Sequence, residues 1–157
     1  MAVLDASARD FRVGGTVLSM PVDESWIERR DPNDPPDTIG LESKVPGRFR
    51  FMVTPWPAGV PSPDDAAIRG RVEQRAAQMA PRTKEKKLAV HDIRGTDSQG
   101  YYFSATDPSN KPGEYRYLHQ GISSSGGRVV AFTAFYNDGG EKDAAAALAA
   151  VRGLRFK

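Results

Sequence analysis

The sequence predicts an α+β fold, an αβα sandwich in which a largely antiparallel β-sheet is flanked by helices. Three observations lead to this prediction. Short runs of β-prone and alternating residues, typical of strands, lie in the first third and in the second half of the chain. The turns between the late runs are too short to contain helical crossovers, so these strands are expected to be antiparallel. Two further segments are typical of helices and would cover the apolar face or faces of the sheet.

The first half of the chain is predicted to supply four strands. Phe49, Phe51 and Val53 alternate with other residues, which is the period-2 pattern of a half-buried strand. The segment 31–37 contains three prolines, which exclude both a helix and a central strand, so it is expected to be a loop. The expected strands are residues 11–20, 26–29, 38–42 and 48–54.

The clearest helix is predicted between residues 62 and 81. Ser62 is a suitable N-cap and Pro63 suits the first helical position, while Pro81 marks the end. An apolar stripe at helical spacing would face the sheet, and charged or polar residues would face solvent. The stripe is Ile68, Val72, Ala76 and Met79; the outward residues are Arg69, Arg71, Glu73, Arg75 and Gln78.

The second half is predicted to be a meander of four strands followed by a helix. Turn-forming segments separate the runs 87–93, 101–106, 115–121 and 128–136. The alanine-rich segment 141–154 is a strong helix former, with Leu148 and Val151 facing inward. A short tail then runs through Leu154 and Phe156.

Size and charge indicate one ordinary globular domain over residues 1–157. The chain has 39% hydrophobic and 27% charged residues, and its 22 basic against 20 acidic residues give a net charge of +2. That field is too weak to support nucleic-acid binding. The basic segment 82–87 is expected to be a solvated helix exit, with an anionic partner patch as the alternative.

The chain contains no cysteine, which excludes disulfides, thiol nucleophiles and thiolate metal sites. No apolar run approaches the length of a membrane span, so no membrane insertion is expected. The first residues lack the pattern of a signal peptide. The protein is expected to be cytoplasmic if Met1 is the native start, and exported to the periplasm if a leader has been trimmed.

Catalytic signatures are missing from the sequence, which predicts no cofactor and no metal site. The segment 121–127 resembles a G-x-S-x-G nucleophile elbow, but Ser125 replaces the last glycine and the context is a hairpin turn. His91 and His119 are the only imidazoles, and no third or fourth metal ligand stands at a recognisable spacing. A hydrolase using residues 123–125 with His119 is the least favoured hypothesis.

The hairpin around residues 101–121 supplies most of the candidate binding residues. Tyr115, Tyr117 and His119 would share one strand face, with Arg116 near the tip. The plainer interpretation is cross-strand aromatic pairing. The alternative is a recognition surface for a partner protein, because tyrosine and arginine often anchor interfaces.

Trp56 is the remaining candidate for partner binding, since it lies between Pro55 and Pro57 in a loop. It is expected either to cap the core or to stand exposed as a partner anchor. Trp26 is expected to be buried.

Two segments resemble the PsbP-like and Ran-binding Mog-like proteins. "FRVGGTVLSMPVDESW" is similar to the family's opening strand, which carries a phenylalanine and a proline and ends shortly before a tryptophan. "YRYLHQGISSSGGRVVAFTAFYNDGGEKDAAAALAAVRGLRF" is similar to its pair of long strands and terminal helix of small residues. The resemblance implies a sheet between helices and a docking or accessory role on a larger partner. Some members attach to photosystem assemblies and others bind a small GTPase.

No catalytic residues are common to that family, and this chain lacks a counterpart of the extensions of its photosystem-linked members. The leading hypothesis is therefore a non-enzymatic module that docks on a partner protein of unknown identity. The runner-up is a small-ligand carrier with a cleft between sheet and helix. The sequence does not specify the oligomeric state.

Overall fold

The computed structural model describes residues 7–57, 59 and 61–157. These residues form ten strands, two α-helices and one short 3₁₀ helix, and all the strand pairs among them are antiparallel. The prediction of a largely antiparallel sheet is confirmed. The elements are β1 (Ser7–Val13), β2 (Thr16–Val22), β3 (Ile27–Glu28), β4 (Ile39–Glu42), β5 (Phe49–Pro55), α1 (Asp65–Met79), η1 (Ala80–Arg82), β6 (His91–Arg94), β7 (Gln99–Thr106), β8 (Tyr117–Ser125), β9 (Arg128–Tyr136), α2 (Glu141–Arg152) and β10 (Arg155–Phe156).

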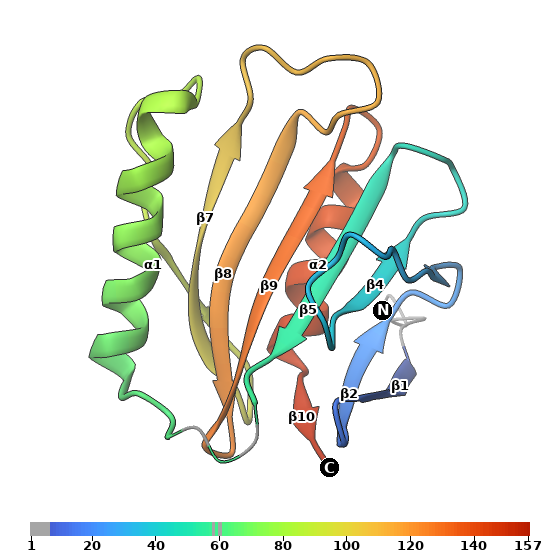
Figure 1. Ribbon diagram of the computed structural model, residues 1–157, viewed down its shortest axis with the longest axis vertical. Helices are drawn as coiled ribbons and strands as arrows, with labels where there is room; N and C mark the ends of the chain where they lie inside the picture. The colour runs from blue at the N-terminus through green and yellow to red at the C-terminus, as the bar shows by residue number, and fades with distance from the viewer. Residues whose placement is uncertain (1–6, 58, 60) are drawn as a thin grey trace, which may run out of the picture.

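The larger sheet has seven strands in the order β3-β4-β5-β9-β8-β7-β6 (Figure 1). Strands β6 to β9 form the meander that the sequence predicts. The first half of the chain joins this meander through the pairing of β5 with β9, which runs from Phe49 opposite Tyr136 to Pro55 opposite Val130. One antiparallel ladder therefore connects the two halves of the sequence.

A second sheet of three strands has the order β1-β2-β10. The prediction of one strand over residues 11–20 is wrong, because a tight turn divides this segment into β1 and β2. Gly14 and Gly15 have φ angles of +55° and +75°, which glycine adopts without the steric cost of a side chain. The C-terminal strand β10 pairs with the far edge of β2, Phe156 opposite Leu18.

The prediction of an αβα sandwich is also wrong, because the fold is mostly β. The helices α1 and α2 contain only 15 and 12 residues. The β1-β2 hairpin does not extend the main sheet; it forms a second sheet that shares one face of the molecule with α2 (Figure 1). On the other face, α1 packs against β7 and β8 and leaves the neighbouring strands uncovered.

The main hydrophobic core lies between the seven-stranded sheet, α2 and the small sheet. Phe49 and Phe51 are fully buried there, and Trp26 packs against both rings. The indole Nε1 of Trp26 donates a hydrogen bond to Asp143 Oδ1 at 2.9 Å, so its polar atom is satisfied at the edge of the core. The predicted burial of Trp26 is confirmed, as is that of Leu148 and Val151.

A smaller core lies beneath α1. Ile68, Val72 and Ala76 are buried against Tyr101 and Phe103 of β7, as the predicted apolar stripe requires, and Met79 is half-buried beside them. All four residues of the predicted stripe therefore face the sheet.

The predicted N-cap of α1 is wrong by two residues. Asp64, not Ser62, is the N-cap, and its Oδ1 accepts a hydrogen bond from the backbone N–H of Ala67 at 2.7 Å. A carboxylate at this position also interacts favourably with the helix dipole, an advantage that the Ser62 hydroxyl lacks.

Three of the four strands in the meander differ from the predicted bounds; β7, for example, begins at Gln99 rather than Tyr101. Residues 87–90 are not a strand, and β6 begins only at His91. Strand β8 begins at Tyr117 rather than Tyr115 and continues to Ser125, so only Gly126 and Gly127 form the turn. Strand β9 has the predicted bounds.

The substitution Asp64→Ala should destabilise the protein by about 1 kcal/mol, because it removes the acceptor for one of the unpaired amides at the start of α1. Urea-induced unfolding measures this difference. Ser62→Ala is the matched control and should change the free energy of unfolding by less than about 0.5 kcal/mol. A larger loss at Ser62 than at Asp64 would contradict the assignment of the cap.

Candidate functional site

The central strands of the main sheet are buried on one face and open on the other. On the α2 side, the side chains of β5, β8 and β9 include fully buried residues such as Phe51, Phe132 and Ser123. On the α1 side, most side chains of the same strands remain half-exposed, because α1 covers β7 and only part of β8. The half-exposed residues are Met52, Thr54, Leu118, Gln120, Ile122, Ala131, Thr133 and Phe135.

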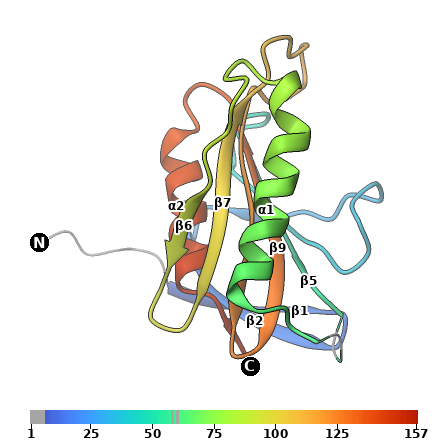
Figure 2. The ribbon, with the colours of Figure 1, turned by 90° about the vertical axis from the view of Figure 1, so that its left-hand side faces the viewer.

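This open face lies between two raised segments. Figure 2 shows α1 and the loop between β3 and β4 projecting from the same side of the sheet. The loop is held over the β5 side by Asp34, whose carboxylate pairs with the guanidinium of Arg50. We call the half-exposed face of β5, β8 and β9 beside α1 the furrow, and this face is its floor; the hollows in it lie next to α1, over β8 and β9.

Three arginines line the α1 side of the furrow. The guanidinium of Arg71 lies over the ring of Trp56, with Cζ 5.1 Å from the ring centroid. Arg75 Nε donates to Gln120 Oε1 at 3.1 Å, and Arg82 borders the floor one turn beyond the helix end. None of the ion pairs among the described residues involves any of these three arginines.

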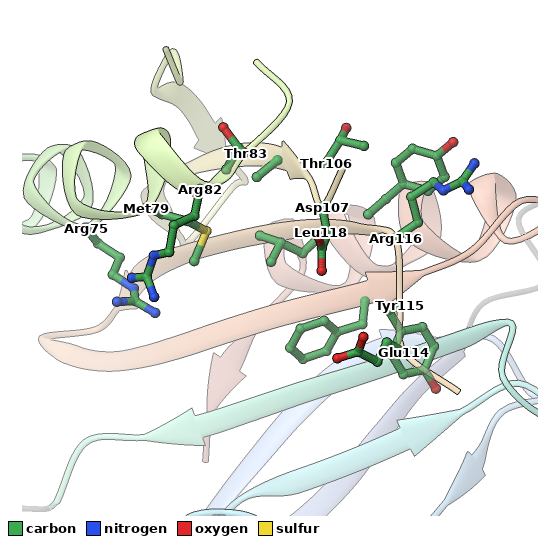
Figure 3. Close-up of a pocket in the computed structure, with 13 residues that line it drawn as sticks. Arg75, Met79, Arg82, Thr83, Thr106, Asp107, Glu114, Tyr115, Arg116 and Leu118 are labelled. Atoms are coloured by element: carbon green, nitrogen blue, oxygen red, sulfur yellow. The ribbon is translucent and has the colours of Figure 1, made fainter. Parts of the chain in front are cut away.

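Two hollows lie along this arginine row. One, of about 250 Å³, is bordered by Arg71 and Arg75 over Ile122 and Ala131. The other, of about 370 Å³, lies between the end of α1 and the β7–β8 loop. Figure 3 shows Arg75 and Arg82 on one side of this second hollow, Leu118 in its centre, and Glu114 and Tyr115 on the other side. Arg75 borders both hollows.

The carboxylates that border the furrow already have partners within the protein. Asp34 and Glu42 both bind Arg50. Asp107 accepts hydrogen bonds from the backbone and hydroxyl of Ser109, and Glu114 Oε1 accepts one from the N–H of Lys111 at 2.7 Å. Hydrogen bonds from neutral donors leave the negative charges of Asp107 and Glu114 in place at the β7–β8 end of the second hollow, so positive charge is concentrated along the α1 side of the furrow.

Trp56 and Tyr115 both lie on the furrow side of the sheet. Trp56 is half-buried immediately after β5, and the guanidinium of Arg71 lies over its ring. Tyr115 packs against Phe135 with the ring centroids 5.7 Å apart. Burial raises the pKa of the Tyr115 hydroxyl, with a further contribution from the charge of Glu42.

Tyr117 and His119 lie on the opposite face, so the structure divides the five candidate residues. Tyr117 stacks on Tyr136 at 5.1 Å and its hydroxyl donates to Asp138 Oδ1 at 2.9 Å. Arg116 is exposed at the tip and forms an ion pair with the same Asp138 at 3.6 Å. Tyr117 and His119 therefore fit the plainer interpretation, aromatic pairing across strands. They do not form one recognition surface with Tyr115.

His119 lies in a row of rings that crosses four strands. Tyr102 contacts it from one side at 5.7 Å and Tyr136 from the other at 5.4 Å, and His91 lies 5.3 Å beyond Tyr102. Gly121 makes room for this row, since a Cβ there would lie 2.7 Å from the Cβ of Tyr102.

The structure does not join residues 123–125 to His119 in a catalytic arrangement. His119 Nδ1 shares a hydrogen bond of 2.6 Å with Ser104 Oγ instead, while Ser123 is fully buried with its hydroxyl directed to the carbonyl of Gln99. Across the described part of the chain, no group of three or more histidine and carboxylate side chains is arranged to hold a metal ion.

Sequence reasoning placed Arg71 and Arg75 in solvent and did not recognise the arginine row. The helical period of α1 does indicate that some of its arginines share one side of the helix. At about 100° per residue, Arg71 and Arg75 fall on one flank of Val72, whereas Arg69 and Glu73 fall on the other flank and pair with each other. Arg82 lies beyond the end of α1, in η1, where this period no longer applies.

None of the helices in the described part of the chain is long and apolar enough to span a membrane. No protein-family model matches this chain, and no curated protein matches it either. The resemblance to PsbP-like and Mog-like proteins therefore stays a prediction.

Acidification should destabilise the protein through His119. Burial, with a smaller contribution from His91, lowers the pKa of His119 below its usual value of 6.5. The unfolded chain then takes up a proton at a pH at which the folded protein does not. The contribution of His119 to stability is therefore fully present above about pH 6.5 and is lost as the pH drops below that value. We expect His119→Gln to reduce the difference between unfolding free energies measured at about pH 7.5 and about pH 5.5.

His91→Gln is the control for this measurement, because it removes an exposed imidazole and leaves His119 buried. It should preserve most of the pH dependence. An equal loss in the two variants would show that burial of His119 is not the cause.

Proposed function

We propose that this protein is a non-enzymatic docking module that receives part of a partner protein in the furrow. The observation that carries the proposal is the unequal burial of β5, β8 and β9. These strands are central in the sheet, and their second face would normally be covered by another layer. A partner that lies over this face would supply that layer.

The residue types in the furrow fit this role. Trp56 and Tyr115 are large amphipathic side chains that offer contact area with little loss of conformational entropy, and arginines are common anchors at interfaces. The floor supplies apolar contact through Leu118 and Phe135. Half-exposed aromatic and apolar groups beside arginines are typical of the centre of a protein interface.

A small-ligand carrier is the second candidate, and the 370 Å³ hollow beside the β7–β8 loop favours it. This volume lies at the lower end of the range of about 300–1,000 Å³ found for ligand pockets. Thermal denaturation with a panel of metabolites separates the candidates, because a ligand of the native state raises the melting temperature. A rise that Leu118→Arg abolishes would favour the carrier.

The docking proposal predicts that Trp56→Ala weakens capture of the partner from the source cell about fivefold or more, since losing an interface tryptophan commonly costs over 1 kcal/mol. Tyr102→Ala is the control: it removes an aromatic residue that contacts His119 on the opposite face, and it should leave capture unchanged. Quantitative pull-down with equal amounts of folded variant measures both. Loss of capture by Tyr102→Ala alone would place the partner on the other face.

A photo-crosslinking residue tests the location directly. p-Benzoylphenylalanine in place of Ala131, on the furrow floor, should form an adduct with another protein in the source cell. The same residue in place of Lys142, exposed on α2 at the opposite face, should not. No adduct from position 131, or equal adducts from both positions, would remove the furrow as the docking site.

A further inference from the structure

We propose that the furrow binds an extended, acidic segment of a partner protein, with its carboxylates against Arg71, Arg75 and Arg82 and its apolar side chains in the two hollows. This inference rests on the proposed docking function and adds the chemistry of the bound segment. The alternatives, a nucleic acid strand and a small anion, become outcomes of the test.

Charge is the first argument. Arg71, Arg75 and Arg82 are exposed and form no ion pair among the described residues, whereas Asp34 and Glu42 are paired with Arg50. Asp107 and Glu114 remain charged on the far side of one hollow, so an anionic segment is expected to lie against α1 and η1 rather than against the β7–β8 loop. A carboxylate that approaches α1 gains charge-assisted hydrogen bonds, and these are stronger than bonds between neutral groups. Guanidinium groups also match carboxylates geometrically.

The spacing of the arginines is the second argument. From Arg71 to Arg82 the chain advances by eleven residues, which corresponds to about 16 Å along the helix. An extended segment of about five residues covers this length. Because alternate residues of an extended chain point to opposite sides, acidic residues two or four positions apart can face α1 in succession.

The furrow floor is the third argument. Leu118 and Phe135 border one hollow, and Ile122 and Ala131 border the other, so each can accept an aliphatic side chain. The amide of Gln120 is already oriented between Arg75 and the Thr133 hydroxyl, to which its Nε2 donates at 3.0 Å. The floor therefore offers apolar contact beside a fixed polar row.

A single-stranded nucleic acid fits this surface less well, because it needs free aromatic faces on which bases can stack. Arg71 already lies over the ring of Trp56, and Tyr115 packs on Phe135. A free anion would satisfy the arginines and leave the apolar floor unused. A peptide that carries both carboxylates and aliphatic groups uses both features.

The test selects a phage-displayed library of random linear peptides against the 157-residue chain. Because the chain has no cysteine, Ala131→Cys creates one site at which a bulky maleimide blocks the furrow floor. Lys142→Cys with the same label is the control and leaves the furrow open. Peptides that bind the control but not the blocked protein should be rich in aspartate or glutamate interspersed with aliphatic residues.

One enriched peptide, labelled with a fluorophore, then measures affinity by anisotropy. Arg75→Gln should weaken binding about fivefold or more, as expected when an interface arginine is lost. Arg69→Gln, on the other flank of α1, should change binding less than about twofold. Raising the salt from about 0.15 M to about 0.5 M should weaken the wild-type complex, because the contacts are between exposed charges.

Enriched peptides that are basic or uncharged would overturn the inference, as would no enrichment over the blocked protein. The inference would also be overturned if a deoxythymidine oligonucleotide or inorganic phosphate bound the furrow and no peptide did. The crosslinking experiment distinguishes failure of this inference from failure of the proposed function. If a partner crosslinks to position 131 and binds the triple variant R71Q/R75Q/R82Q unchanged, the docking function is retained and the acidic segment is ruled out. If nothing crosslinks to position 131, the docking function itself is ruled out.

Discussion

The ladder between β5 and β9 is the constraint on which the rest of the fold depends. It pairs segments about eighty residues apart in the chain, from Phe49 opposite Tyr136 to Pro55 opposite Val130, and so joins the N-terminal strands to the C-terminal meander. Closing so long a loop has an entropic cost that only long-range apolar contacts can offset. The buried rings of Phe51 and Phe132, which lie on the same face of the joined strands, supply such contacts.

That ladder also decides which face of the sheet is covered. The β1-β2 hairpin, β10 and α2 all pack on the face that carries Phe51, so this side receives a second sheet and a helix. The opposite side receives only α1, which sits over β7 because its apolar stripe meets Tyr101 and Phe103. The uncovered floor of the furrow is thus a consequence of where the available apolar surfaces lie, and it requires no special feature in β5 or β9 themselves.

Local sequence patterns predicted the elements better than their assembly. Strand β9 and the apolar stripe of α1 follow from β propensity and helical period, whereas β10 is two residues long and exists only because it pairs with β2. The prediction of one strand over residues 11–20 overlooked a local signal, because Gly14-Gly15 between two β-prone runs is typical of a two-residue hairpin. The αβα prediction failed because no local pattern shows that this hairpin starts a separate sheet.

The same distinction holds for the candidate site. The sequence singled out Trp56 and Tyr115 as candidates for partner binding, and this role stays a prediction. Assigning Tyr115 to the face of Tyr117 assumed a strand that begins at residue 115; the strand begins at Tyr117, so the alternation does not reach Tyr115. The arginine row shows the reverse case. Helical geometry places Arg71 and Arg75 on one flank of α1, yet only the tertiary structure shows that this flank, with Arg82 of η1 beyond it, borders an open sheet rather than bulk solvent. Like charges held in a row repel one another, and an anionic segment laid along them would relieve that repulsion at the same time as it covered the apolar floor.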